Sequence, residues 1–194
     1  MIPTPTQDIG FVIDIEATCW DTKEEQGSKP NEVIEIGVAV YEYATGTVID
    51  RASLVVRPRR TEVSPFCTEL TGWTQEQLVD QGKDIARVLR EFRNTYNPTP
   101  EHIWYSCGQY DKNMLSSNTQ KGLNALYGIK ADVNPFDIMQ HVNIKTEFAA
   151  LKGYKKEKGM EGMLDAIGET LEGRHHNGAD DAFNIAKIVR YVIS

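Results

Sequence analysis

The sequence predicts an α/β fold in which a mixed five-stranded sheet is flanked by helices. Three β-type segments come before the first long helical pattern, and two further strands are interleaved with helices after it. The 194 residues, 40% of them hydrophobic and 25% charged, are enough for a substantial core. We therefore expect residues 1–194 to form a single domain.

Runs of β-branched and aromatic residues predict the first three strands, which span residues 11–16, 33–43 and 47–57. Ala44-Thr45-Gly46 supplies a tight turn between the second and the third strand, so we expect these two to form a hairpin. The charged stretch 21–31 is expected to be a loop.

Helical patterns and strands alternate in the rest of the chain. Residues 103–106 are predicted to be the fourth strand and 132–137 the fifth, with Asp137 capping the helix that follows. This order of elements is the one that ribonuclease-H-like folds use. The expected helices carry, in chain order, Ile85, Val88, Leu89 and Phe92 at helical spacing, then Asp111, Met114 and Leu115, then Met160, Met163, Leu164 and Ile167, and finally the residues after Asn177-Gly178.

Composition restricts the setting of the protein. No apolar run approaches the roughly 20 residues of a membrane helix, and the first residues, MIPTPTQ, lack the layout of a signal peptide. Three widely spaced cysteines, Cys19, Cys67 and Cys107, indicate reduced thiols. We therefore expect a cytoplasmic protein without a membrane partner.

The net charge of −7 would ordinarily argue against a nucleic-acid partner, because phosphate contacts need lysine and arginine. Two features weaken this argument. Two divalent cations held by four carboxylates would bring the net charge to −3, and basic residues gather at 57–60 and within 145–158. Charge alone therefore leaves the partner open.

Four acidic residues form a candidate metal site. Asp14 and Glu16 are two residues apart in an otherwise apolar strand, so they share a face, and their repulsion indicates a cation between them. Asp111 follows the fourth strand and Asp181 begins the last helix, where an α/β sheet gathers ligands. A single acid at a helix start also complements the helix dipole, so the argument depends on all four together.

The last helix offers two adjacent acids, which helical spacing separates. Asp181 lies on the apolar stripe and faces the core, whereas Asp180 is expected to be a surface residue. His176 lies five residues before Asp181, and an imidazole with a pKa of about 6.5 suits a general base. His175 is expected to point elsewhere.

Three motifs stand in order along the chain: Asp14-Ile-Glu16-Ala-Thr, Tyr110-Asp111, and His176 with four residues between it and Asp181. Together they resemble the motifs of the DEDDh 3′→5′ exonucleases, the superfamily of RNase T and DnaQ. The resemblance spans residues 10–190. It is greatest to the branch of KapD and the histone-mRNA 3′ exonuclease, through the stretches Phe66-Cys-Thr-Glu-Leu-Thr-Gly72 and Gly173-Arg-His-His-Asn-Gly-Ala-Asp-Asp181.

This resemblance implies a two-metal hydrolysis of single-stranded RNA or DNA, with RNA preferred, from a free 3′ end to release 5′-mononucleotides. Asp14, Glu16, Asp111 and Asp181 would hold two Mg²⁺ ions, and Mn²⁺ would substitute for them. His176 would take the proton of the attacking water. The residues implied to bind the terminal nucleotide are Ala17, Thr18, Phe66, Leu70, Thr71 and Tyr110.

Three other functions fit part of this pattern. A proofreading or repair exonuclease would apply the same chemistry to DNA, because recognition of the 2′-hydroxyl depends on backbone placement. A noncatalytic nucleic-acid-binding module would be expected to have lost an acid or the histidine, and all five are present. A ribonuclease-H-type endonuclease shares the fold, but His176 before the last helix disfavours it.

Overall fold

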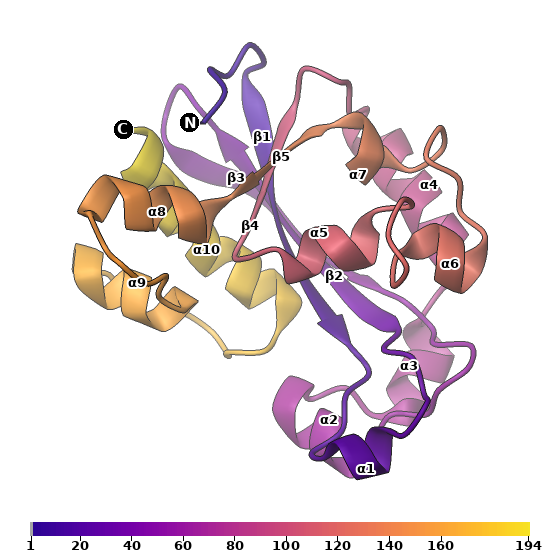
Figure 1. Ribbon diagram of the computed structural model, residues 1–194. Helices are drawn as coiled ribbons and strands as arrows, with labels where there is room; N and C mark the ends of the chain where they lie inside the picture. Colours follow the sequence, from indigo (N-terminus) through magenta and orange to yellow (C-terminus); the bar gives the residue numbers. More distant parts are fainter. Residues whose placement is uncertain (1) are drawn as a thin grey trace.

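The computed structural model describes residues 2–194 and contains one five-stranded sheet. Its strands are β1 (Ile9–Ala17), β2 (Val33–Glu42), β3 (Thr47–Val55), β4 (Ile103–Ser106) and β5 (Gln140–Asn143). Their order is β3-β2-β1-β4-β5 (Figure 1). The pairs β1–β2 and β2–β3 are antiparallel, whereas β1–β4 and β4–β5 are parallel, which confirms the predicted mixed sheet.

Helices pack on both faces of this sheet. They are α1 (Lys23–Gln26), α2 (Pro65–Thr71), α3 (Gln75–Gln81), α4 (Ile85–Tyr96), α5 (Tyr110–Leu115), α6 (Leu123–Tyr127), α7 (Pro135–Ile138), α8 (Ile144–Lys152), α9 (Met160–Ile167) and α10 (Gly178–Ile193). Figure 1 shows α8, α9 and α10 grouped on one side of the strands, and α4, α6 and α7 on the other. None of the helices within residues 2–194 combines the length and the apolar character needed to cross a bilayer.

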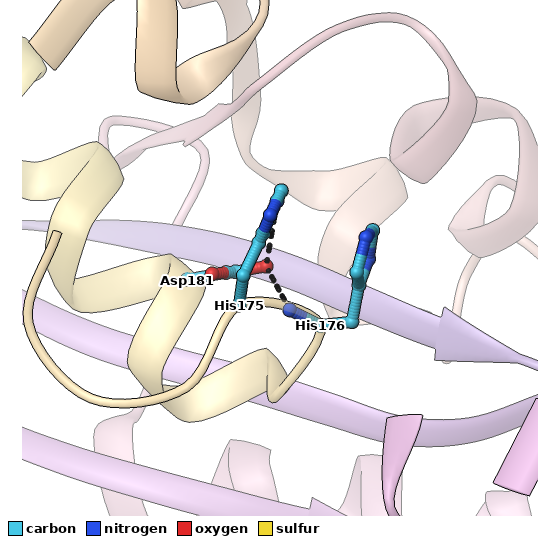
Figure 2. Close-up of side chains that lie close together, drawn as sticks. All are labelled: His175, His176 and Asp181. Carbon is cyan, nitrogen blue, oxygen red and sulfur yellow. Dashed lines mark hydrogen bonds and ion pairs between the residues drawn. The ribbon is translucent and has the colours of Figure 1, made fainter. Parts of the chain in front are cut away.

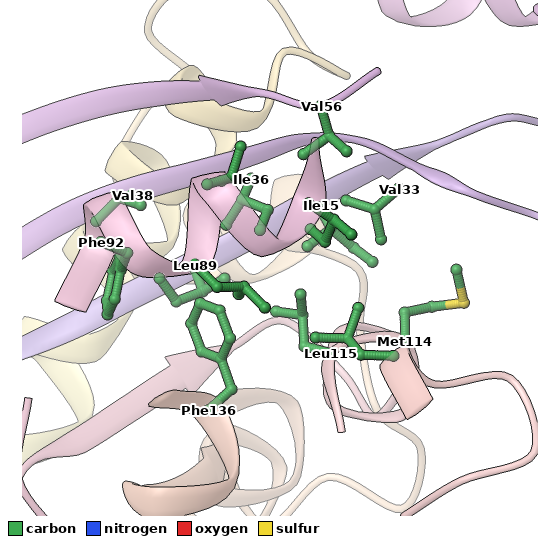
Figure 3. Packing of buried hydrophobic residues seen from close by; sticks show 14 of the residues in the cluster. Ile15, Val33, Ile36, Val38, Val56, Leu89, Phe92, Met114, Leu115 and Phe136 are labelled. Carbon is green, nitrogen blue, oxygen red and sulfur yellow. The ribbon is translucent and has the colours of Figure 1, made fainter. Parts of the chain in front are cut away.

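Alternation along β1 separates the core from the site. Ile13 and Ile15 point to the face covered by α4 and join the apolar cluster of Figure 3. Val12 points to the opposite face and packs in a second cluster with residues of α10. Asp14 and Glu16 continue on the face of Val12 because successive strand residues alternate. The two carboxylates therefore emerge on the side where α10 begins.

The first turn of α10 lies very close to β2 because both elements have glycine at the contact. Gly37 pairs with Asp14 in the β1–β2 register, and a Cβ atom at residue 37 would collide with the backbone of Gly178. The Gly178 N–H also donates a hydrogen bond to Glu35 Oε2 on β2 (3.2 Å). These contacts set the start of α10, and with it the position of Asp181.

The predicted position of the fifth strand is wrong. Residues 132–137 form a turn and the beginning of α7, and the strand follows at Gln140–Asn143. Asn134 caps α7 by accepting a hydrogen bond from the Phe136 N–H (3.2 Å). Pro135 occupies the first helical position, where its fixed φ suits a helix and its missing N–H costs nothing. A cap followed by proline thus decides the local structure.

Asp137 does not cap the next helix, which corrects the second prediction for this segment. Its carboxylate accepts hydrogen bonds from Ser116 Oγ and from the Ser117 N–H, both at 2.9 Å, and so fastens α7 to the end of α5. Asn143 caps α8 instead, because its side chain accepts from the Lys145 N–H (3.1 Å).

Several short helices were not predicted. The stretch 21–31, expected to be a loop, contains α1, and α2 and α3 have only seven residues each. Helices this short give little hydrophobic periodicity in the sequence. The sequence marks them mainly by their N-cap residues. Ser64 precedes Pro65 at the start of α2, and Thr74 forms a capping box with Gln77 at the start of α3.

We expect Gly37→Ala to destabilise the protein strongly, because the added methyl group must push α10 away from β2. A loss of about 3 kcal/mol would lower the Tm by about 6–12 °C in a chain of this size. Gly162→Ala is the matched control, since its Cβ would meet only the Lys158 side chain at 3.6 Å and alanine favours a helix. Thermal unfolding followed by circular dichroism compares the two, and equal Tm values would contradict the close approach.

Candidate active site

Three carboxylates meet at the end of β1, beside the start of α10. An oxygen atom from each of Asp14, Glu16 and Asp181 lies within 4.8 Å of the other two. Glu16 and Asp181 are buried, with only 7% and 4% of their surface exposed. Oδ1 of Asp181 has no hydrogen-bond partner among residues 2–194. A buried carboxylate oxygen of this kind is costly unless a cation binds it.

Asp111 reaches the same place from the first turn of α5. Its side chain is buried, and its Oδ1 accepts a hydrogen bond from the Ile15 N–H on β1 (3.1 Å). Burial, and next the charge of Asp111, raise the pKa of Asp14 well above its usual value. The structure thus brings together four acids that come from three separate motifs.

Burial raises the pKa of the other three acids as well. The pKa of Glu16 rises to about 8, first through burial and then through the charges of Asp181 and Glu35. Burial raises the pKa of Asp111 and of Asp181 to about 6. A bound cation would relieve this cost of ionisation. Because the donors are carboxylate oxygens, the group fits Mg²⁺ or Mn²⁺.

The loop before α10 brings two histidines to the carboxylates. His176 has a φ of +63°, in the left-handed region, and its N–H donates a hydrogen bond to Asp181 Oδ2 (2.9 Å). The rings of His175 and His176 are stacked, with centroids 4.0 Å apart and planes at 13°. Nε2 of His175 lies 3.8 Å from Asp181 Oδ2 (Figure 2). The prediction that His175 points elsewhere is wrong, because the left-handed turn places both rings on one side of the loop.

Asp180 has a different environment from Asp181. Its carboxylate accepts a hydrogen bond from the Arg174 N–H (2.7 Å) and forms an ion pair with Arg51. Its own N–H donates to the side chain of Asn177, the residue that caps α10 (3.1 Å). Asp180 therefore fastens the histidine loop from outside the site, whereas Asp181 faces inward, as helical spacing predicts.

Asp14, Glu16, Asp111, Asp181 and both histidines line one cleft of about 480 Å³. Three of the residues predicted to bind the terminal nucleotide, Ala17, Leu70 and Tyr110, also line it. Tyr110 is 51% exposed, so its ring is available to a ligand. The cleft thus combines charged residues with apolar ones.

The structure does not bring the other three predicted nucleotide contacts to the cleft wall. The hydroxyl of Thr18 is buried and is hydrogen-bonded to Thr61 Oγ1 (3.1 Å). The hydroxyl of Thr71 is also buried and donates to the Cys67 carbonyl oxygen (2.8 Å). Phe66, half-buried at the start of α2, is not among the lining residues. Hydroxyls that are satisfied inside the protein are turned away from a ligand.

The sequence profile of the exonuclease family, RNase_T, matches residues 11–189, which is nearly the whole chain. The chain belongs to this exonuclease family. The matched range contains the four acids Asp14, Glu16, Asp111 and Asp181 and both histidines of the cleft.

Two relatives and one solved structure illustrate how this exonuclease compares with known proteins. ERI1 exoribonuclease 2 of Danio rerio is 29% identical over 197 residues, covering 95% of this chain and 35% of that protein. ERI1 exoribonuclease 3 of Mus musculus is 28% identical over 201 residues, covering 98% and 56%. The nuclease domain of 3′hExo, a DEDDh family member bound to rAMP, has a TM-score of 0.79 and 27% identity, covering 97% of this chain and 92% of that one. The exonuclease chain therefore spans between a third and somewhat over half of these two curated relatives.

Sequence reasoning missed Glu35, a fully buried acid of the exonuclease that pairs with Glu16 across β1 and β2. Its carboxylate accepts hydrogen bonds from Ser53 Oγ (2.6 Å), Trp73 Nε1 (2.8 Å) and the Gly178 N–H (3.2 Å). Glu35 thus anchors α10 to the sheet. The available signal was an acid inside the apolar run of β2, the same pattern that singled out Asp14.

Two further charged residues of the exonuclease cleft were not predicted. Lys145, at the start of α8, lines the cleft, and its charge partly offsets the effect of burial on the pKa of Asp111. Glu161, in the first turn of α9, lies 3.7 Å from Nδ1 of His175. Both positions depend on how α8 and α9 pack beside β4 and β5, which no local pattern shows.

The raised pKa of Glu16 predicts how the stability of the metal-free exonuclease depends on pH. Glu16 holds its proton up to about pH 8 in the folded state but only to about 4.5 in the unfolded chain. The free energy of unfolding should therefore fall as the pH rises through this window. Glu16→Gln removes the buried charge, so its Tm at the upper end of the window should exceed the wild-type value by several degrees.

Thermal unfolding in chelator and in excess Mg²⁺ measures this effect. Mg²⁺ should raise the Tm of the wild type more than that of Glu16→Gln, because the variant has lost a ligand. Glu169→Gln, at an exposed acid outside the cleft, is the control and should behave as the wild type does. A Glu16→Gln protein less stable than the wild type in chelator at the upper end of the pH window would show that the buried charge of Glu16 does not destabilise the folded state.

Proposed function

We propose that this exonuclease hydrolyses single-stranded RNA from a free 3′ end and releases 5′-mononucleotides. The observation that carries the proposal is the meeting of Asp14, Glu16, Asp111 and Asp181 with His176 in one cleft. Carboxylates that hold divalent cations beside a general base are the groups that metal-assisted phosphodiester hydrolysis requires. The exoribonuclease names of the relatives support RNA as the substrate.

Asp14, Glu16 and Asp181 would hold one Mg²⁺ or Mn²⁺ ion, and Asp14 with Asp111 would hold a second. When bound, the two cations would supply positive charge at the attacking and the leaving oxygen of an in-line displacement. The 4.8 Å cluster and the unpartnered Asp181 Oδ1 support the first position. The repulsion between Asp111 and Asp14 supports the second.

We assign the general base to His176. Burial, and next the neighbouring His175, lower the pKa of its imidazole from 6.5, so the ring is neutral at neutral pH and can accept a proton. The ring would take the proton of the attacking water while the ribose 3′-oxygen leaves. The hydrogen bond from the His176 N–H to Asp181 supports this role, because it holds the histidine at the reacting phosphate.

The terminal nucleotide would contact Ala17, Leu70 and Tyr110. The exposed ring of Tyr110 suits base stacking, which accepts any base and therefore allows successive nucleotides to be removed. Lys145, which also lines the cleft, would neutralise a phosphate. Thr18 and Thr71 would contribute indirectly, through their neighbours Ala17, Cys19 and Leu70 that line the cleft, and the contact predicted for Phe66 stays a prediction.

Several parts of the proposal concern the setting of the enzyme. Residues 1–194 would act as one exonuclease domain, of which residue 1 lies outside the described residues. Cys19, Cys67 and Cys107 are unpaired within the described chain, which supports a reducing, cytoplasmic compartment. Single-stranded RNA is the proposed partner. A DNA-directed proofreading or repair role would use the same cleft, but the relatives favour RNA.

The direct test supplies 5′-labelled single-stranded RNA and DNA of one sequence with Mg²⁺. We expect a descending ladder of RNA products, slower cleavage of DNA, and no cleavage of RNA that carries a 3′-phosphate. Asp181→Asn, purified in the same way, controls for contaminating nucleases. Internal cleavage of the 3′-blocked RNA would overturn the exonuclease assignment, and faster cleavage of DNA would overturn the substrate.

The adjacent acids of α10 give a matched pair of variants. Asp181→Asn should reduce kcat by about a thousandfold or more, because it removes a metal ligand. Asp180→Asn should retain most activity, because asparagine keeps an oxygen that can accept from the Arg174 N–H. Steady-state kinetics at saturating Mg²⁺ measures both. Equal losses would mean that Asp180 also acts in the cleft.

The assignment of His176 predicts a pH profile. Under conditions in which chemistry limits the rate, kcat should rise with pH as the imidazole loses its proton and then stay high. Because the pKa of His176 is lowered, the half-maximal rate should lie below pH 6.5. His176→Asn should leave a small residual activity without this rise. A wild-type rate that is flat between about pH 5 and 8 would exclude His176 as the base.

A further inference from the structure

Two imidazoles and a carboxylate form a second group of possible metal ligands in the cleft. Each of His175, His176 and Asp181 offers one ligand atom within 4.8 Å of the other two. Figure 2 shows both rings rising side by side next to the Asp181 carboxylate. This group shares only Asp181 with the carboxylate cluster of Asp14 and Glu16.

The two nitrogens of His175 face different partners. Nε2 lies 3.8 Å from Asp181 Oδ2, and Nδ1 lies 3.7 Å from Glu161 Oε1. Histidines that bind metals commonly donate the N–H of the second ring nitrogen to a carboxylate, which orients the ring and raises its basicity. Glu161 is placed to do this for His175 and would leave Nε2 free to bind a cation.

The chemistry of this group differs from that of the four acids. Imidazole nitrogen suits Zn²⁺, whereas carboxylate oxygens suit Mg²⁺. Two histidines, one acid and an open fourth position are a ligand set that Zn²⁺ uses in proteins. Oδ1 of Asp181, which is buried and has no hydrogen-bond partner within residues 2–194, adds an acceptor to this group.

The ligands can reach zinc-binding geometry by side-chain rotation. Zn–N bonds of about 2.0–2.1 Å at a tetrahedral angle place two donors about 3.3 Å apart. The rings are now stacked with centroids 4.0 Å apart. His175 is 38% exposed and lies in an open cleft of about 480 Å³, so its ring has room to turn.

We propose that His175, His176 and Asp181 form a Zn²⁺ site, oriented by Glu161, whose occupation inhibits the exonuclease. The consequence for activity rests on the proposed function, because Zn²⁺ would bind the lone pair with which His176 accepts a proton and would compete for Asp181. The binding itself does not depend on it. The site would make the enzyme sensitive to free Zn²⁺ even when Mg²⁺ is saturating.

Isothermal titration of the whole chain with Zn²⁺ in excess Mg²⁺ tests the site directly. We expect one Zn²⁺ per chain for the wild type, binding weakened about a hundredfold in His175→Ala, and about tenfold in Glu161→Gln. Asp165→Asn, at an exposed acid one turn further along α9, is the matched control and should bind as the wild type does. Equal Zn²⁺ affinities in the wild type and His175→Ala would overturn the proposal.

Two more measurements separate this site from the carboxylate cluster. Co²⁺ bound in place of Zn²⁺ should show the visible absorption of four-coordinate cobalt in the wild type and in Asp14→Asn, but not in His175→Ala. Loss of that absorption in Asp14→Asn alone would place the ion among the acids instead and overturn the proposal. Inhibition is measured as the hydrolysis rate with Zn²⁺ divided by the rate of the same protein without Zn²⁺. Zn²⁺ should lower this ratio in the wild type more than in His175→Ala. Zn²⁺ binding without any Mg²⁺-dependent hydrolysis would refute the proposed function and leave the site intact.

Discussion

Repulsion between buried carboxylates is the constraint on which the rest of this structure depends. Asp14 and Glu16 are carried by β1 toward Asp111 and Asp181, where burial first and then the neighbouring acids raise the cost of ionising each of the two. Apolar packing on both faces of the sheet must offset that cost. The alternation of side chains along β1 allows this strand to supply both the packing and the acids. Its odd-numbered residues join one core cluster, whereas Val12 joins the other cluster and Asp14 and Glu16 follow on the same face.

The position of the last helix is set by polar and steric contacts as much as by its apolar face. Gly37 allows the backbone of Gly178 to approach β2, and Glu35 binds the N–H of that same residue. Asn177 then caps the helix, and Asp181 holds the His176 N–H. All of these contacts are short and directional, and all lie in or next to the first turn of α10. They therefore fix the distance between the acids of β1 and the histidine loop.

The parts of the molecule predicted from sequence are those in which a periodic pattern decides the structure. The strand carrying Asp14 and the helical phase that separates Asp180 from Asp181 follow from side-chain directions alone. The fifth strand was misplaced because Asn134 and Pro135 start a helix whatever the pattern nearby. The orientation of His175 depends on one left-handed residue, and the cleft positions of Lys145 and Glu161 depend on packing between distant elements. Neither a single backbone conformation nor packing between distant elements leaves a periodic pattern in the sequence.

The site draws its groups from opposite parts of the chain: Asp14 and Glu16 lie on the first strand, whereas His176 and Asp181 lie at the start of the last helix. During synthesis the ribosome releases the first pair long before the second. A domain of this kind folds as a unit, so the nascent chain cannot bring these four side chains together until α10 has emerged and docked on β2. The candidate active site is thus completed last, by the docking of a single helix.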